Sequence, residues 1–150
     1  MNLHYYLKLT AALYLLVCFC DLRWRKIPNN LLLALLLVQL IGVYFSNFFI
    51  GSSILILALG MLAYSVGICG AGDVKFCALA ALSLPISSLS VALILTALMG
   101  GGLAVMFMLL GWLTRRRPNP VNYRQLPYGV AISLGFYITT YDHLMPVLAS

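Results

Sequence analysis

The chain is short of charge, and above all of negative charge. It has no glutamate and only three aspartates, and with nine lysines and arginines only 8% of its 150 residues are charged, against roughly a quarter in an ordinary soluble domain. So few charges exclude a soluble globular domain, whose surface they would have to cover. A hydrophobic content of 63% also excludes a disordered chain. The composition, with a mean hydropathy of +1.04, is that of an integral membrane protein.

The patterns of common metal and disulfide sites are missing as well. The four cysteines, at positions 18, 20, 69 and 77, include no C-x-x-C pair, so their spacing matches neither a zinc site nor a disulfide framework. We interpret them as small packing residues. The two histidines, His4 and His143, lie far apart along the chain. We therefore expect no metal site and no other cofactor.

Two long runs without formal charge set the expected number of membrane crossings. They are the 46 residues between Lys26 and Asp73 and the 39 residues between Lys75 and Arg115. At ~1.5 Å rise per residue, each run is long enough for about two crossings. The first twenty residues and those after residue 124 allow one more crossing each. We therefore predict an all-α, polytopic membrane protein with six transmembrane helices, in one membrane-embedded domain covering residues 1–150.

Turn-forming residues place the breaks between these helices. Phe45-Ser46-Asn47-Phe48 divides the first run, and Pro85 with its neighbouring serines (residues 83–88) divides the second, because proline ends a helix and serine favours turns. The expected helices are 3–20, 31–46, 51–69, 73–84, 89–113 and 127–147. The fourth is too short to cross a bilayer alone, so we expect it to tilt or to enter only partway.

The lysines and arginines give the expected orientation. Lys8 apart, they fall in the first, third and fifth loops, and positively charged loops stay in the cytoplasm. Both termini are then on the outer side. The basic cluster after the first helix, Arg23-Trp24-Arg25-Lys26, would resist translocation, so we expect residues 3–20 to be a span and not a cleaved signal peptide. We attribute the net charge of +6 to contact with anionic membrane lipids and expect no nucleic-acid partner.

The three aspartates differ in their surroundings. Asp142 lies near the outer end of the last predicted helix, where a solvated helix terminus explains it. Asp21 closes the first predicted helix and is followed by basic residues, so one interpretation is an ion pair with the neighbouring arginines. Asp73 follows Gly70-Ala71-Gly72, and one interpretation is a helix N-cap after a glycine turn. An ionisable residue at membrane depth is also a functional candidate.

The predicted topology brings Asp21 and Asp73 to the same boundary. Asp21 ends an inward-running helix and Asp73 begins an outward-running one, so both lie at the cytoplasmic face and meet if helices 3–20 and 73–84 pack together. Two carboxyl groups in close contact share one proton. One of them can then activate a water molecule while its protonated partner donates to the carbonyl under attack. This is the chemistry of an aspartic protease, and it needs no metal.

Three segments carry a resemblance to a known family. They are Asp21–Asn29, which reads Asp-x(5)-Ile-Pro-Asn; Gly70–Lys75, which contains Gly-x-Gly-Asp; and Leu126-Pro127-Tyr128-Gly129. In this order, within a chain of six predicted spans, they resemble the prepilin peptidases (type IV leader peptidases), membrane aspartic proteases with a G-x-G-D motif. The resemblance covers nearly the whole chain.

The resemblance implies a function and a set of site residues. Asp21 and Asp73 match the catalytic aspartates, and the supporting motif residues are Gly70, Gly72, Lys75, Pro28, Asn29, Pro127, Tyr128 and Gly129. A turn after Pro127 also explains Pro-Tyr-Gly. The family removes a short basic leader from prepilin-like proteins, just before a hydrophobic helix, at the cytoplasmic side of the bacterial inner membrane. The implied partners are a prepilin or pseudopilin substrate and membrane lipids.

One departure from the family pattern matters. Larger members have an N-terminal domain with paired C-x-x-C motifs that accompanies methylation of the new amino terminus. The segment between the first two predicted helices has no such pair. The chain therefore resembles the short, peptidase-only form found in tight-adherence (Flp) pilus systems, and we expect neither a methyltransferase nor a zinc domain.

Two other classes of function compete with this interpretation. A non-catalytic membrane protein of pilus or secretion assembly would use the helices only as an interaction surface, and glycines 100–102 do permit close helix packing. A small transporter would need polar groups spaced through the membrane depth. In this sequence Asp21 and Asp73 are expected at one face, which favours the peptidase.

Overall fold

The computed structural model describes residues 3–42, 49–113 and 128–149, and within these ranges it is helical and contains no strand. The predicted all-α fold is confirmed for this part of the chain. The elements are α1 Leu3–Trp24, α2 Asn29–Gly42, α3 Ile50–Ser65, α4 Ala71–Ala80, the short 3₁₀ helix η1 Ala81–Ser83, α5 Ile86–Leu113 and α6 Tyr128–Ala149.

Two prolines precede helices. The carbonyl of Pro28 accepts hydrogen bonds from the N–H groups of Leu31 and Leu32, and α2 begins at Asn29, which is its first helical residue. Leu84, before Pro85, is extended (φ −121°, ψ 131°), as proline requires of the residue before it. The break at Pro85 is confirmed, but it is shorter than predicted because α5 already begins at Ile86.

Other predicted boundaries were wrong. Helix α3 ends at Ser65 and not at residue 69, because Gly67 adopts a left-handed conformation (φ 80°). The N–H of Gly67 donates to the carbonyl of Tyr64, and that of Ile68 donates to the carbonyl of Ala63. These are the two hydrogen bonds of a Schellman motif, which ends a helix at a glycine. Helix α1 runs to Trp24, past the predicted end at residue 20. The predicted break at residues 45–48 lies outside the described residues.

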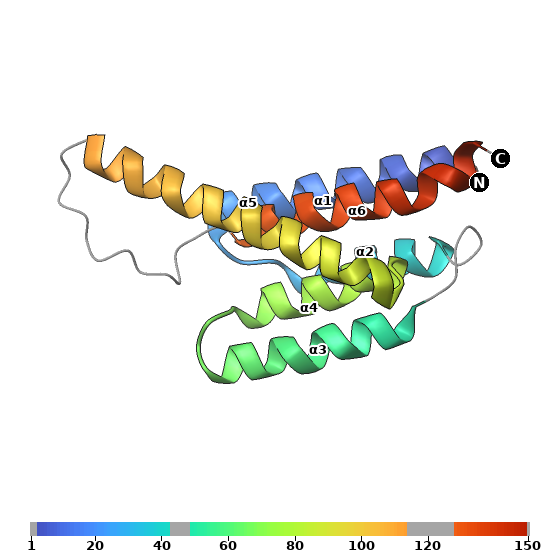
Figure 1. Ribbon diagram of the computed structural model, residues 1–150, viewed down its shortest axis with the longest axis horizontal. Helices are drawn as coiled ribbons and strands as arrows, with labels where there is room; N and C mark the ends of the chain where they lie inside the picture. The colour runs from blue at the N-terminus through green and yellow to red at the C-terminus, as the bar shows by residue number, and fades with distance from the viewer. Residues whose placement is uncertain (1–2, 43–48, 114–127, 150) are drawn as a thin grey trace.

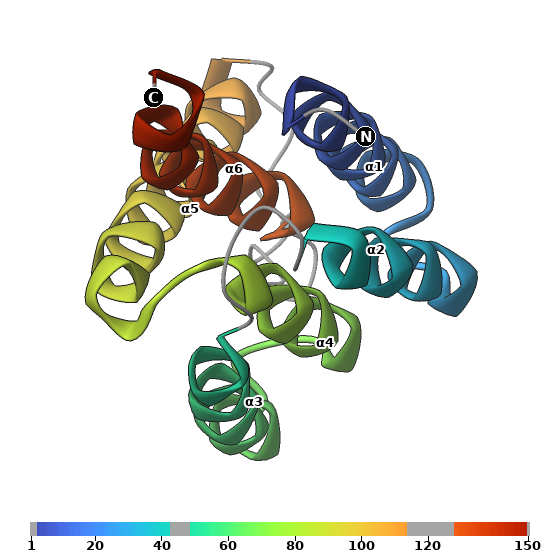
Figure 2. The same ribbon diagram turned by 90° about the vertical axis from the view of Figure 1, so that its right-hand side faces the viewer.

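The helices form a bundle whose ends carry different chain segments. Figure 1 shows α1 and α6 side by side, with α4 and α3 on the far side of the molecule from them. Seen end-on, α3 is the outermost helix and packs on α4, while α6 lies between α1 and α5 (Figure 2). The start of α1 and the end of α6 lie at one end of the bundle, and the end of α1, the α3–α4 turn and the start of α6 lie toward the other (Figure 1).

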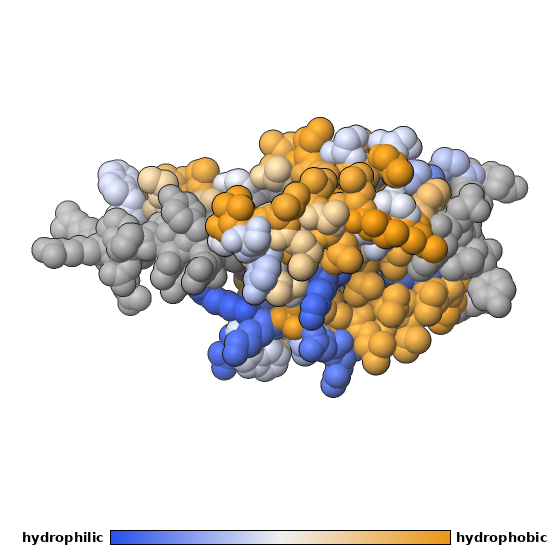
Figure 3. Space-filling model, turned by 90° about the horizontal axis from the view of Figure 1, so that it is seen from below, coloured by the Kyte–Doolittle hydropathy of each residue, from blue (hydrophilic) through white to orange (hydrophobic). Residues whose placement is uncertain are grey.

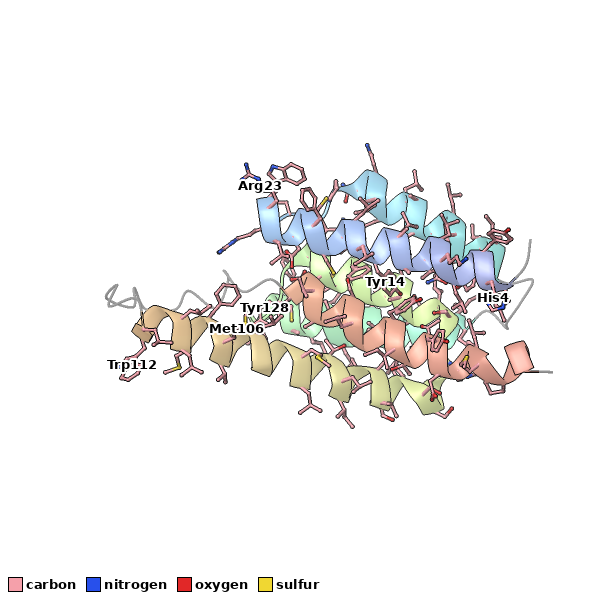
Figure 4. The ribbon with its side chains drawn as sticks, turned by 90° about the horizontal axis from the view of Figure 1, so that it is seen from above. His4, Tyr14, Arg23, Met106, Trp112 and Tyr128 are labelled. Atoms are coloured by element: carbon pink, nitrogen blue, oxygen red, sulfur yellow. The ribbon has the colours of Figure 1, made fainter. Side chains whose placement is uncertain are left out.

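The sequence made the meeting of Asp21 and Asp73 conditional on packing between α1 and α4, and in the structure these two helices are linked mainly through others. The main neighbours of α1 are α6 and α2, and these two helices also contact α4. A direct link comes from aromatic rings, since the centroids of Tyr14 on α1 and Phe76 on α4 are 5.3 Å apart in an edge-to-face arrangement. Both side chains are buried, and Tyr14 points into the bundle in Figure 4. Thus α6 is shared between α1 and α4.

The surface of the molecule is strongly apolar. Two described helices are long and apolar enough to cross a membrane, α1 with 22 residues and residues 86–110 of α5 with 25. Helices α2 and α3 are apolar but shorter, and α4, with ten residues, is too short for a crossing, as predicted. Hydrophilic side chains gather in one region of the face in Figure 3, and apolar ones cover much of the rest. The six complete membrane crossings, and the side of the membrane on which each terminus lies, stay predictions.

Candidate active site

The end of α1 places Asp21 inside the protein. Asp21 lies in the last turn of α1 and is buried, with 6% of its surface exposed. Arg25 ends the helix in a left-handed conformation (φ 53°), and its N–H donates to the carbonyl of Asp21 at 2.9 Å. This turn brings Arg25, Lys26 and Ile27 to the same pocket as Asp21. Arg25 contributes a favourable charge to Asp21, but the carboxylate makes its hydrogen bond elsewhere.

The hydrogen-bond partner of Asp21 comes from α6, far along the chain. The N–H of Gly129, in the first turn of α6, donates to Asp21 Oδ2 at 2.7 Å. A Cβ atom at Gly129 would lie 2.8 Å from Asp21 Oδ2 and 3.0 Å from its Cγ, closer than real Cβ atoms approach such groups. Glycine is therefore required here for Asp21 to take this position. The sequence placed Gly129 in a motif but gave it no contact with Asp21.

Asp73 is held by the turn that joins α3 to α4. The N-cap of α4 is Gly70, and Asp73 lies in the first turn of the helix, so the interpretation of Asp73 as an N-cap was wrong. A Cβ at Gly70 would lie 3.0 Å from Asp73 Oδ2, which means that the carboxyl group folds back over this glycine. A Cβ at Gly72 would make only ordinary contact, 3.7 Å from Ile27.

Asp21 and Asp73 line the same pocket, of about 860 Å³. Its walls come from the end of α1, from the α3–α4 turn with the start of α4, and from Tyr128 at the start of α6. Figure 4 shows Tyr128 and Arg23 toward one end of the bundle and His4 at the other. Three segments that are widely separated in the sequence thus meet in one polar cavity.

The other predicted site residues divide into two groups. Gly70, Gly72 and Tyr128 line the pocket, and Gly129 contacts Asp21. Side chains that are exposed and do not line the pocket are those of Pro28, Asn29 and Lys75. Asp142 is also exposed, near the far end of α6, and Pro127 lies outside the described residues.

The pocket favours one proton on the aspartate pair. Burial and, to a smaller extent, the charge of the Asp21 carboxyl raise the pKa of Asp73 from 3.8 to about 6, against a hydrogen bond from the backbone of Gly70 that lowers it. In the turn before α4, burial and the charge of Asp73 also raise the pKa of Cys69. Near neutral pH, therefore, Cys69 is a neutral thiol, and Asp73 exchanges its proton readily. Such a pair can serve as general acid and general base.

The pocket contains two carboxyl groups but, among the described residues, no cluster of metal ligands. Across residues 3–42, 49–113 and 128–149, no group of three or more His, Cys, Asp or Glu side chains is placed to hold a metal ion. The four cysteines are free thiols, each half-buried. Besides the two carboxyls, five charged or titratable side chains line the pocket: Arg25, Lys26, Tyr64, Cys69 and Tyr128.

Comparison with known proteins identifies the family. A sequence profile of the type IV leader peptidase family matches residues 9–105, a segment that includes both Asp21 and Asp73. Searches of curated proteins and of solved structures gave no match. Members of the matched family are membrane peptidases that act on prepilin-like proteins. The match spans more than half of the chain, and the chain belongs to the type IV leader peptidase family.

Proposed function

We propose that this protein is an aspartic endopeptidase with Asp21 and Asp73 as its catalytic residues. It removes the short basic leader of prepilin-like proteins at the cytoplasmic face of the bacterial inner membrane. The observation that carries the proposal is the presence of both carboxyl groups in one pocket, with Asp73 titrating near pH 6. A pair of carboxyls that holds a single proton supplies an acid and a base together.

In the proposed reaction, the ionised carboxylate takes a proton from water as the water oxygen bonds to the scissile carbonyl carbon. The protonated partner gives its proton to the carbonyl oxygen. The tetrahedral gem-diol then collapses as the C–N bond breaks, and the proton taken from water passes to the leaving nitrogen. A hydroxyl proton returns to the second carboxyl, so the pair ends in its starting state. The products are a leader with a new carboxyl group and a mature protein with a new amino terminus.

The position of the pocket suits a substrate that is half in lipid. The pocket lies toward one end of the bundle, where Arg25 and Lys26 also line it, and these cations favour the headgroup level of a bilayer. A prepilin-like substrate can keep its hydrophobic helix in lipid beside the apolar helices while its leader stays in water. The scissile bond then lies between the two regions, at the depth of the carboxyl pair.

Within its family we propose the short, peptidase-only form. The segment between α1 and α2, residues 25–28, contains no cysteine pair, and the larger members carry such pairs with their methylating domain. The proposed topology has six crossings with both termini on the periplasmic side, which leaves the carboxyl pair on the cytoplasmic side. Tight-adherence (Flp) pilus systems use peptidases of this form.

The test uses purified protein in lipid nanodiscs and a peptide with a basic leader followed by an apolar helix. We expect a single cut between leader and helix, located by mass spectrometry. Either Asp21→Asn or Asp73→Asn lowers the rate at least roughly 100-fold, the scale of general acid–base catalysis. Asp142→Asn is the matched control and keeps full activity, because Asp142 is exposed and does not line the pocket. Tight binding of an uncut peptide by the wild-type protein would instead favour a role in assembly.

A further inference from the structure

The first turn of α6 is aimed at one member of the carboxyl pair. The first four N–H groups of a helix have no partner within the helix, and here the Gly129 N–H has Asp21 Oδ2 as its partner at 2.7 Å. The backbone of Val130 adds a smaller contribution to the same carboxyl. Because an N–H can only donate, this contact favours the ionised form of the carboxylate. The positive end of the helix dipole acts in the same direction.

Two charged groups near Asp21 bear on which carboxyl of the pair is ionised, the cation Arg25 and the carboxyl of Asp73. The charged and titratable side chains that line the pocket with Asp21 are those of Arg25 and Lys26 after α1, Tyr64 on α3, Cys69 in the α3–α4 turn, Asp73 on α4 and Tyr128 at the start of α6. Cys18 on α1 interacts electrostatically with Asp21. Arg25 favours negative charge on Asp21. Among charged groups, Asp21 has the largest effect on the pKa of Asp73. A proton on Asp73 is therefore stabilised when Asp21 is ionised.

We propose that Gly129 is a positioning residue, whose N–H holds Asp21 as the carboxylate that takes the proton from water and leaves Asp73 as the acid that protonates the substrate carbonyl. This assignment rests on the proposed peptidase function and divides its two roles. It also gives the Pro-Tyr-Gly motif a purpose beyond a turn. The glycine allows the close approach of the α6 backbone to Asp21, and the amide of the same residue makes the hydrogen bond.

The test removes this hydrogen bond in two ways. Gly129→Ala places a Cβ against the carboxyl group of Asp21. The second change replaces the Gly129 amide by an ester, using glycolic acid in cell-free synthesis into nanodiscs, and it removes the N–H without adding a side chain. The N–H has no acceptor within α6, so the ester is compatible with folding even if the alanine variant is not.

Gly51 provides a matched control for both changes. It is the second residue of α3, as Gly129 is of α6, and a Cβ there would make only an ordinary contact, 3.7 Å from Ile86. Gly51→Ala and the ester at Gly51 therefore test alanine and ester at the same helix position away from the pocket. We expect both to retain the wild-type kcat and pH profile.

For Gly129, we expect kcat for the peptide to fall roughly 10- to 100-fold, the worth of a hydrogen bond to a charged group, with KM changed less than about twofold. We also expect the acidic limb of the kcat/KM profile to move up by about one pH unit, because the ionised base has lost its donor. A purely structural role for Gly129 would lower the amount of folded protein and leave this limb in place.

Two results would overturn the inference. Unchanged kcat and pH profile in the ester variant would show that the N–H does not act on the pair. A shift confined to the alkaline limb would give Asp21 the role of the acid. In either case, loss of cleavage in Asp21→Asn and Asp73→Asn would leave the proposed peptidase function standing. Full cleavage by those two variants would end the proposed function itself.

Discussion

Replacing Asp73 by asparagine is expected to make the folded protein more stable while it removes activity. Burial and the charge of Asp21 raise the pKa of Asp73 from 3.8 to about 6 in the folded state. The folded state therefore binds this proton more tightly than the unfolded chain does. As the pH rises from about 4 to about 6, the folded state is the one that must give up a tightly held proton, so its stability falls.

The size of this effect follows from the shift. About two pH units correspond to about 3 kcal/mol at 1.36 kcal/mol per unit, and this is an upper value because Asp73 is only partly buried. Asparagine carries no charge at any pH and keeps nearly the same shape. Asp73→Asn should therefore gain up to about 3 kcal/mol over the wild type above pH 6, and the gain should disappear below about pH 4.

The assay is unfolding of both proteins in the same detergent between pH 4 and pH 8, followed by denaturant titration or by Tm. Asp142→Asn, at an exposed site, is the control and should show no gain at any pH. An Asp73→Asn variant no more stable than the wild type at pH 8 would refute the burial argument. An equal gain at pH 4 and at pH 8 would also refute it, because the proton would then have no part in the effect.

Four further predictions concern activity and topology. The kcat/KM of the wild type should decline as the pH rises above about 6, because Asp73 loses the proton that the acid must donate; a flat profile from pH 6 to pH 9 would contradict this. Gly70→Ala, which crowds Asp73 Oδ2, should reduce the cleavage rate roughly tenfold. Gly72→Ala should reduce the cleavage rate less, because a Cβ there makes only ordinary contact with Ile27. A larger loss for Gly72→Ala than for Gly70→Ala would show that the Gly70 contact is unimportant. A reporter fused near Pro118 should report cytoplasm and one after Ser150 should report the exterior; an exterior signal at Pro118 would contradict the predicted topology. The purified protein, given a prepilin and S-adenosylmethionine, should trim the leader without methylating the new amino terminus, and methyl transfer would contradict the peptidase-only form.

The elements of the fold were largely predictable from local chemistry. The charge-free runs and Pro85 gave the number and order of the helices, because proline and turn-forming residues act over only a few positions. The short α4 was foreseen from the distance between Asp73 and Pro85. The end of α3 was missed because Gly67 was read as part of a helix, although a glycine followed by Ile68 is also the pattern of a Schellman motif.

The candidate site was predictable only in part. Asp21 and Asp73 were found because acids are so rare in this chain, and the motifs around them gave their type. What a sequence cannot give is the link between Asp21 and Gly129, which are separated by 108 positions. That hydrogen bond depends on how α6 packs on α1, and packing of apolar helices leaves no local pattern that fixes the partner of a single amide.

The most direct test of the two-carboxyl mechanism is the cleavage rate of one prepilin-like peptide by four proteins at matched abundance. These are the wild type, Asp21→Asn, Asp73→Asn and the double variant. Residues that act as a unit on one water are strongly non-additive, so we predict that each single variant loses nearly all activity and that the double variant is slower by no more than about threefold. Substantial cleavage by either single variant, or two losses that multiply in the double variant, would contradict the mechanism.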